Sequence, residues 1–214
     1  MFNLIWILYM NQKVKLGKRE LKRAALKDKL INSALNRINE HMLLGLRARD
    51  ITAEAGCSLG ALYTVFDDLD ALILQVNSIT LQQLGDHLAA SVKNDATPTQ
   101  NLVALAKAYA TFAWDNFNQW SALFEHRMPK GGSVPDWHIQ EHSILFENIS
   151  RPVISLMPKA SAQEVTTITR TLFASTHGIV SVGIHERLAS IPRDELDAQL
   201  EHFVRTFVKG LGCN

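Results

Sequence analysis

Two histidines and a glutamate in the C-terminal half have the spacing of a zinc site. They occur as His138-Ile-Gln-Glu141-His142, which matches the pattern H-x-x-E-H. Residues four apart share one face of a helix, so both imidazoles could bind one Zn²⁺ while the glutamate acts as a base. Catalytic zinc also needs a third protein ligand, and so short a motif often occurs by chance. A zinc-dependent hydrolase and adventitious metal binding are therefore kept as alternatives, and no metal is predicted as a cofactor.

Other catalytic signatures are missing from the sequence. It contains no G-x-S-x-G, P-loop or G-x-G-x-x-G pattern, so neither a serine hydrolase nor a nucleotide-binding protein is indicated. The two cysteines, Cys57 and Cys213, form no C-x-x-C pair. Lone thiols are typical of a reducing compartment. We therefore predict a cytoplasmic protein that is not an enzyme and has no cofactor.

The segment from Arg47 to Phe66, RARDITAEAGCSLGALYTVF, has the pattern of two short helices around a turn. Apolar residues repeat at helical spacing on both sides of Gly-Cys-Ser. Gly56 can end the first helix because it adopts positive φ without steric cost, and Ser58 can cap the second. Two helices joined by a short turn containing Gly form a helix-turn-helix, whose second helix can enter the major groove of DNA.

This segment resembles a known family. AEAGCSLGALYTVF followed by DDLDAL is similar to the signature of TetR/AcrR-type transcriptional regulators, and the similarity extends from about Lys22 to about Leu84. The remainder, from about Gln83, resembles the WHG type of TetR C-terminal domain through LFEHRMP, VPDWH and Thr176-His177-Gly178. Thr176 stands where that type has its name-giving tryptophan. The family also usually has a glycine near Met42, whereas the first glycine available here is Gly45.

The resemblance and the pattern together predict the DNA-contacting residues. Tyr63 resembles the family's phosphate-contacting tyrosine, Gly60 allows close approach of the backbone, and Thr64 can contact a base. Two phosphate candidates lie on the first helix of the helix-turn-helix, and the other predicted residues lie at the start of the second helix or along it. The full set is Arg47, Arg49, Ser58, Leu59, Gly60, Ala61, Tyr63 and Thr64. The second helix offers no Arg, Asn or Gln for bidentate base recognition, so specificity could depend on DNA shape.

Aromatic residues in the C-terminal part are candidates for lining a cavity. The resemblance implies a small apolar effector, for which two histidines could be polar handles. The predicted ligand-binding residues are Phe112, Phe117, Trp120, Phe124, His142, Phe146 and His177. The alternative is that these rings form ordinary core and that each histidine is satisfied by a carbonyl group. In that case the protein would be a DNA-binding helical module without an effector.

Charge is distributed unevenly along the chain. Residues 11–66 contain eleven Lys or Arg and five Asp or Glu, a net charge of +6, whereas residues 67–214 carry −5. A basic N-terminal third beside an acidic remainder suits a polyanion-binding head. The apolar segment of residues 1–10 is too short to span a bilayer, so no membrane association is predicted. We expect Met10 to be the biological start, with a mobile or packed N-terminal tail as the alternative. The basic segment of residues 11–23 could be a solvated, disordered arm in the free protein, could contact DNA phosphates, or both.

Helical periodicity persists throughout, and no strand alternation does, so an all-α fold is predicted. The expected helices cover about 21–41, 47–55, 59–66, 67–92, 98–115, 116–127, 135–156, 162–188 and 193–211. Asp67-Asp68 and Thr97-Pro98 supply start signals for two of them.

The predicted organisation has three parts. Residues 1–22 form a tail or basic arm, 23–82 a three-helix DNA-binding head with its supporting helix, and 83–214 an effector-binding and dimerisation domain. The long fourth helix would link the head to this domain. The family resemblance implies a homodimer through the eighth and ninth helices that binds a near-palindromic, double-stranded DNA operator, most often as a repressor.

Overall fold

The computed structural model describes residues 17–128, 132–184 and 191–212. Within these ranges the protein contains nine α-helices and one short 3₁₀ helix, and no strand, so the all-α prediction is confirmed. The expected N-terminal start and the first part of the basic segment, residues 11–16, lie outside the described residues. The elements are α2 (Lys18–His41), η1 (Leu43–Gly45), α3 (Ala48–Glu54), α4 (Leu59–Tyr63), α5 (Leu69–Ser91), α6 (Pro98–Asp115), α7 (Phe117–Glu125), α8 (Asp136–Leu156), α9 (Ala162–Ile184) and α10 (Arg193–Gly210).

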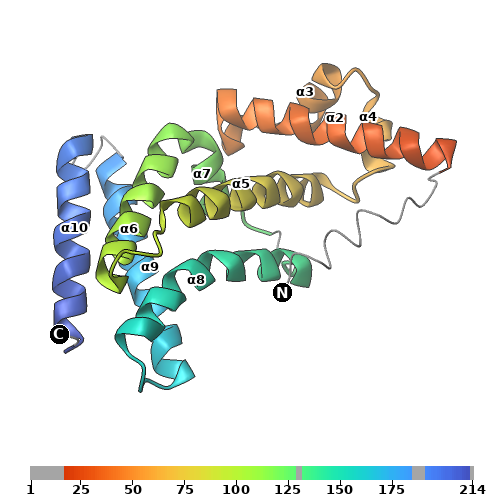
Figure 1. Cartoon of the computed structure of the whole chain (residues 1–214). Coiled ribbons are helices and arrows are strands. Elements are labelled where there is room, and N and C mark those ends of the chain that lie inside the picture. Colours follow the sequence, from red (N-terminus) through yellow and green to blue (C-terminus); the bar gives the residue numbers. More distant parts are fainter. Residues whose placement is uncertain (1–16, 129–131, 185–190, 213–214) are drawn as a thin grey trace.

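The N-terminal helices form a small head that packs on the first half of α5 (Figure 1). Its core consists of fully or almost fully buried aliphatic and aromatic side chains from α2, α3, the α4 region and α5. These are Leu30, Ile31, Ala34, Ile38, Ile51, Leu62, Phe66, Leu72 and Val76. The three N-terminal helices alone bury too little apolar surface for a stable domain. The head core therefore depends on side chains from α5, such as Leu72 and Val76.

The turn between α3 and α4 follows the sequence signals. Gly56 has φ +68°, and Cys57 follows it as a half-buried free thiol. Ser58 caps α4, because its hydroxyl oxygen accepts the Ala61 N–H at 3.3 Å. The helix ends at Tyr63, earlier than the predicted Phe66. The Thr64 hydroxyl donates to the Ala61 carbonyl at 2.7 Å, and this local bond accompanies the helix end.

The exit from α2 uses a methionine in an unusual conformation. Met42 has φ 60° and ψ 176°, a region that side chains other than glycine rarely occupy. Gly45, the first available glycine, has a different role. A Cβ atom there would lie 2.7 Å from the His41 Cβ, so Gly45 permits the close approach of η1 to the end of α2.

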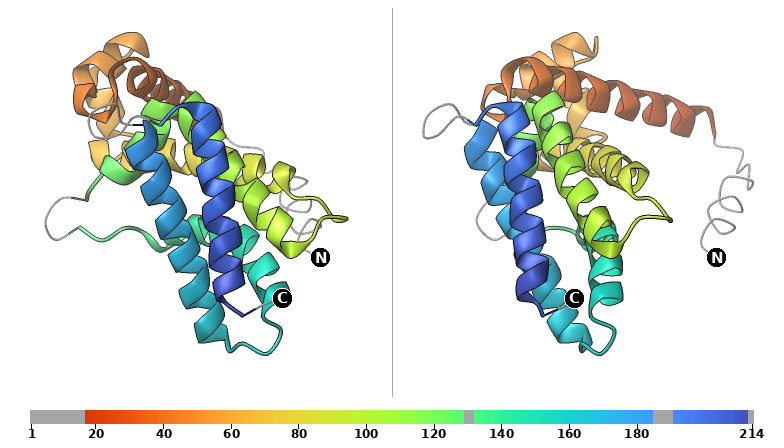
Figure 2. Two further views of the ribbon diagram at one scale, coloured as in Figure 1. Left: turned by 90° about the vertical axis from the view of Figure 1, so that its left-hand side faces the viewer. Right: turned by 60° about the vertical axis from the view of Figure 1, so that its left-hand side comes forward.

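The remaining helices form the body, in which α6 lies between α5 and the pair α9 and α10 (Figure 2). Thr97 caps α6 as predicted, because its hydroxyl accepts the Gln100 N–H at 3.2 Å. The Gln100 side chain adds a reciprocal bond that was not predicted, accepting the Thr97 N–H at 2.7 Å. The predicted end of the eighth helix, after Ile184, falls partly outside the described residues. None of the described helices is long and apolar enough to cross a membrane.

The helix α5 belongs to both hydrophobic cores. Leu72 and Val76 lie in the head core, whereas Leu81, Leu84 and Leu88 lie in the body core. The helix runs without interruption from Leu69 to Ser91, so the head and the body share one rigid element. A displacement of α5 by the body would therefore be transmitted directly to the head.

Candidate functional site

The predicted DNA-contacting residues form an exposed face on α4 and the turns at its two ends. Ser58, Gly60 and Thr64 are exposed, and Leu59 and Tyr63 expose 38% and 50% of their surface. Leu62 points the other way and is completely buried in the head core. One side of this short helix therefore holds it in place, and the other side is free to meet a partner.

Gly60 has no packing reason to be glycine in the described residues. A Cβ atom at this position would meet nothing within 4 Å. The neighbouring Ala61 is half-buried, so a small residue there fits the packing of the head. An open position without a side chain in the middle of the face is consistent with the close approach of another molecule.

The two predicted phosphate contacts lie at the start of α3. Arg47 occupies the N-cap position and Arg49 lies in the first turn, and both are exposed. The acidic residue of the same turn, Asp50, pairs with Arg37 at 3.5 Å. Among the described side chains, neither Arg47 nor Arg49 has an acidic partner, so their positive charge is available for an external anion.

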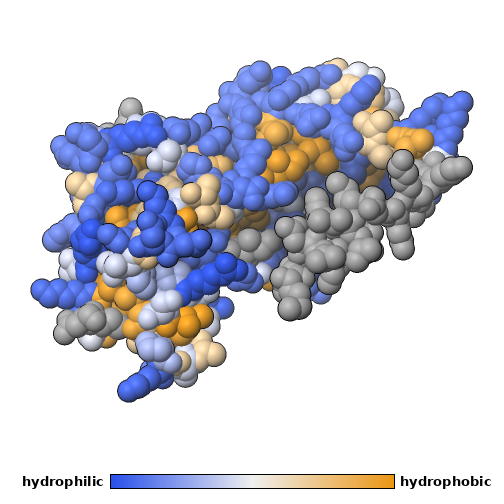
Figure 3. All heavy atoms as spheres, in the orientation of Figure 1, coloured by the Kyte–Doolittle hydropathy of each residue, from blue (hydrophilic) through white to orange (hydrophobic). Residues whose placement is uncertain are grey.

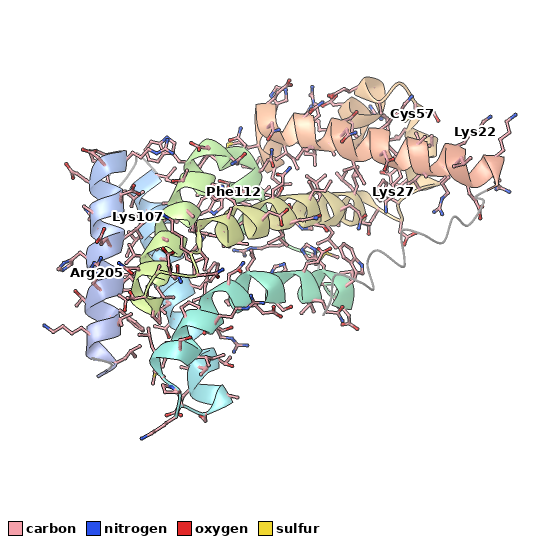
Figure 4. The ribbon with its side chains drawn as sticks, viewed as in Figure 1. Lys22, Lys27, Cys57, Lys107, Phe112 and Arg205 are labelled. Carbon is pink, nitrogen blue, oxygen red and sulfur yellow. The ribbon has the colours of Figure 1, made fainter. Side chains whose placement is uncertain are left out.

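Further basic residues extend along α2, where Lys22 and Lys27 are visible in Figure 4. On the face in Figure 3 the upper edge of the head is hydrophilic, with hydrophobic patches below it. Arg23 of the same helix donates to the Val65 carbonyl at 3.5 Å and so links α2 to the end of the α4 region. The head thus combines a small polar face with surrounding positive charge, the combination that DNA backbones attract.

The body contains an apolar cavity of about 30 Å³, which is room for one or two water molecules. Residues from five helices form its wall, in which leucines dominate, with one tyrosine, one phenylalanine and one threonine. The lining residues are Leu84, Leu88, Leu102, Leu105, Ala106, Tyr109, Leu145, Ile149, Leu172, Phe173, Thr176 and Val204. None of the seven predicted ligand-binding residues lies in this lining.

Two of those seven residues, Trp120 and His177, contact Tyr109 instead, beside the cavity wall. The Trp120 indole N–H donates to the Tyr109 hydroxyl at 2.9 Å, and Tyr109 is hydrogen-bonded to His177 Nδ1 at 2.8 Å. Burial raises the pKa of Tyr109, and the bond from Trp120 partly opposes that rise. Burial lowers the pKa of His177, so its imidazole is neutral near pH 7. Tyr109 therefore joins the cavity to a buried polar network.

The other predicted aromatic residues have ordinary neighbours. Phe124 packs against His177 with ring centroids 4.1 Å apart, and Phe117 packs against Trp120 at 6.2 Å. Two further predicted rings have other neighbours: Phe146 packs against Phe173, and Phe112 packs against His87. Sequence reasoning missed Tyr109, Phe173 and Thr176 as lining residues. Thr176 precedes the predicted His177, which is the one signal that could have indicated it.

The seventh predicted residue, His142, lies apart from this network. It is on α8 near His138, with ring centroids 4.9 Å apart, in the H-x-x-E-H segment. His138 Nδ1 lies 3.4 Å from Glu141 Oε2. Among the described residues, however, no group of three His, Cys, Asp or Glu side chains is arranged to hold a metal ion. Within the described part of the chain, the zinc-hydrolase alternative therefore has no third ligand.

Comparison with known proteins gives a consistent result. Residues 102–207 match the family model described as the tetracyclin repressor-like C-terminal domain. The HTH-type transcriptional regulator BetI of Brucella suis is 29% identical over 115 residues, which are 52% of this chain and 56% of BetI. This match therefore spans only about half the length of the curated relative.

Solved structures share the fold over nearly the whole chain. A protein of unknown function from Rhodococcus sp. RHA1 has a TM-score of 0.70 at 21% identity, over 94% of this chain and 98% of that protein. The transcriptional regulator FadR from Bacillus subtilis, solved in complex with stearoyl-CoA, has a TM-score of 0.59 at 13% identity, over 86% of this chain and 98% of FadR. At these identities the likeness establishes the fold alone.

Proposed function

Because this chain belongs to the TetR family of transcriptional regulators, we propose that it is a ligand-responsive repressor that binds a near-palindromic operator as a homodimer. The observation that carries this proposal is the α4 face. Its polar and small residues are exposed around Gly60, while Leu62 anchors the helix from behind. Residues 23–82 act as the DNA-binding unit and residues 83–214 as the effector-binding and dimerisation unit.

Affinity for DNA comes mainly from phosphate contacts and specificity from α4. Arg47, Arg49 and Tyr63 contact the backbone, whereas Thr64 and the atoms around Gly60 approach the base edges. The remaining predicted residues, Ser58, Leu59 and Ala61, hold the backbone of α4 against the groove. Two heads about one DNA turn or more apart then read the two halves of an inverted repeat.

Dimerisation through α9 and α10 is supported by the apolar surface these helices leave uncovered. Val182 on α9 exposes 46% of its surface, and Phe203 and Phe207 on α10 are half-buried. The family dimer pairs such helices around a two-fold axis. Sedimentation equilibrium should give a dimer, and a monomer at micromolar concentration would contradict this part of the proposal.

The effector enters the apolar cavity beside Tyr109. Since the cavity now holds about 30 Å³, a ligand must push the surrounding helices apart. Leu84 and Leu88 of α5 are in its wall, so an expanded cavity displaces the helix that supports the head. The effector acts only through a higher affinity for this displaced state. FadR was solved with stearoyl-CoA, which supports an apolar ligand for the present chain.

Selection from a random pool of duplex DNA tests the DNA-binding part. The enriched sequences should contain an inverted repeat, and the Arg47→Ala/Arg49→Ala variant should bind it more weakly with a shallower dependence on salt, by about one unit of slope for each lost contact. Arg151→Ala, an exposed arginine on α8 paired with Glu147, is the matched control. Enrichment of no sequence, or an equal loss in the control, would refute the proposal.

A thermal-shift screen of small apolar compounds tests the effector. Hits should raise the melting temperature and weaken operator binding, and a cavity-filling Thr176→Trp variant should abolish both effects. A protein that no apolar compound stabilises would instead be the DNA-binding module without an effector.

A further inference from the structure

The wall of the apolar cavity in the body carries no charged side chain. Among the described residues that line it, ten have hydrocarbon side chains and two, Tyr109 and Thr176, have a hydroxyl group. No Lys, Arg, His, Asp or Glu belongs to this part of the lining. A charged ligand would therefore meet no residue of opposite charge inside the cavity.

The polar groups beside the cavity are uncharged near pH 7 and already have partners. The Tyr109 hydroxyl accepts the Trp120 indole N–H at 2.9 Å and is hydrogen-bonded to His177 Nδ1 at 2.8 Å. Burial raises the pKa of Tyr109 and lowers the pKa of His177, so both side chains are neutral. An ionised ligand group would have to compete for hydrogen bonds that the protein has already made.

The charged side chains next to the lining residues in sequence neutralise one another. Lys107 follows the lining residue Ala106 on α6 and reaches Glu201 of α10, with 2.6 Å between Nζ and Oε2 (Figure 4). Arg205 follows the lining residue Val204 on α10 and lies 2.9 Å from the other carboxylate oxygen of Glu201. One partly exposed carboxylate thus pairs with both cations, so neither is free to balance an anionic ligand in the cavity.

The size of the cavity limits the ligand as well. Its present volume is about 30 Å³, whereas an apolar cavity of about 150 Å³ holds benzene. Binding therefore requires the surrounding helices to separate, and each further ligand atom increases that separation. A compact ligand with a single ring needs the smallest change. An ion is disfavoured in addition, because an apolar cavity cannot replace the water that the charge loses.

We propose that this cavity selects compact, uncharged, hydrocarbon-rich molecules, such as monocyclic aromatic compounds, and rejects ionised acids and amines. The inference rests on the proposed function, because it names the chemical class of the effector for the same cavity. A weak acid or base enters only as its neutral form. Its apparent affinity therefore follows the fraction of the ligand that is uncharged.

Isothermal titration of the full chain, without DNA, tests this selectivity. The probe is toluene, and the matched ligands are benzoate and benzylamine, which keep the ring and add a negative or a positive charge. Toluene should bind saturably, once per chain, and at least about a hundredfold more tightly than either ion.

A second titration changes only the charge of one ligand. 4-Nitrophenol ionises near neutral pH, whereas nitrobenzene stays neutral. The affinity for 4-nitrophenol should fall at least about tenfold between about pH 6 and about pH 8.5, because only the neutral form binds. The affinity for nitrobenzene should stay constant over the same range, which controls for titration of the protein itself.

Variants locate the bound toluene. Leu145 lines the cavity on α8 and is almost fully buried. Leu145→Ala enlarges the cavity and should bind toluene at least about tenfold more tightly, because the helices need to separate less. Ile154→Ala shortens an exposed aliphatic side chain on the same helix and should bind as the wild type does. Equal affinity of the wild type and Leu145→Ala would place toluene elsewhere and overturn the inference.

The titrations separate failure of this inference from failure of the proposed function. Affinity for benzoate or benzylamine within about tenfold of that for toluene would overturn the inference and leave the effector site in place. The same holds for an affinity for 4-nitrophenol that does not change with pH. Binding of none of these ligands up to about 3 mM would overturn the inference together with the effector part of the proposed function, whereas operator binding would stand.

Discussion

Tyr63 on α4 and Tyr109 on α6 carry the same side chain in opposite surroundings. Tyr63 exposes 50% of its surface, while Tyr109 exposes 4%. The hydroxyl of Tyr109 is bonded to both Trp120 and His177. The hydroxyl of Tyr63 is bonded to no described residue.

The contrast separates binding from stability. An exposed aromatic side chain contributes little to the free energy of unfolding. Its apolar surface is therefore still available for contacts with a partner. A buried tyrosine with satisfied hydrogen bonds contributes packing and polar partners that the unfolded chain must lose. Substitutions in the α4 face should therefore change DNA affinity, and substitutions around Tyr109 should change the free energy of unfolding.

The largest effect is expected at Trp120, which exposes only 2% of its surface. Trp120→Ala should lower the free energy of unfolding by about 3–5 kcal/mol, because it leaves a large cavity and removes the donor to Tyr109. Urea denaturation measures this. A loss below about 1 kcal/mol would mean that the body core is not packed around this ring.

Tyr109→Phe removes one oxygen atom and should cost about 1–3 kcal/mol, since the buried Trp120 N–H loses its acceptor. The same denaturation experiment applies. Operator affinity of the folded variant should be unchanged, and a variant as stable as the wild type would show that the network carries little energy.

Tyr63→Ala should have the reverse profile. The free energy of unfolding should change by less than about 0.5 kcal/mol, because the side chain is half exposed. Affinity should fall by about tenfold on all duplex sequences alike, as expected for a lost phosphate contact. Gel shifts with specific and unrelated duplexes measure this, and undiminished operator affinity would remove Tyr63 from the DNA-contacting set.

A smaller change concerns the head alone. Met42→Gly should raise the free energy of unfolding by about 1 kcal/mol, because glycine adopts the positive φ of this position without strain, while the loss of a half-buried side chain offsets part of the gain. Gly45→Ala should destabilise the head, since its new Cβ would meet that of His41. Chemical denaturation measures the free energy of unfolding of both variants. A Met42→Gly variant that is less stable than the wild type would contradict the expectation.

The smallest effect is a pH dependence that arises in the body. Burial holds the pKa of His177 below its unfolded value of 6.5, so the unfolded chain binds more protons below that pH. The contribution of neutral His177 is thus present at pH 7 and lost as pH falls from about 6.5 through the lowered pKa. His177→Gln should make the melting temperature depend less steeply on pH between about pH 7 and pH 5. An unchanged dependence would exclude His177 as a source of the pH effect.

Much of the fold could be predicted from local signals. The Thr97-Pro98 start, the Gly56 turn and the Ser58 cap depend on neighbouring residues only, and each has the predicted geometry. The end of α2 was less predictable, since the glycine expected near Met42 is absent and Met42 itself takes the unusual conformation. The orientation of α4 was also predictable, because Leu62 is the one residue of this short helix that is fully buried in the head core.

The sequence by itself determined the helices, their caps and the division between a basic head and an acidic body, because hydrophobic period, capping and charge are encoded within a few residues. Only the tertiary structure decided which buried residues line the cavity. Helical spacing places Phe112 and Tyr109 on the inward side of α6 alike, but it does not say which neighbouring helix covers each one. The same holds for Ser78 and Glu141, which are far apart in the chain and form a hydrogen bond only because α5 packs on α8.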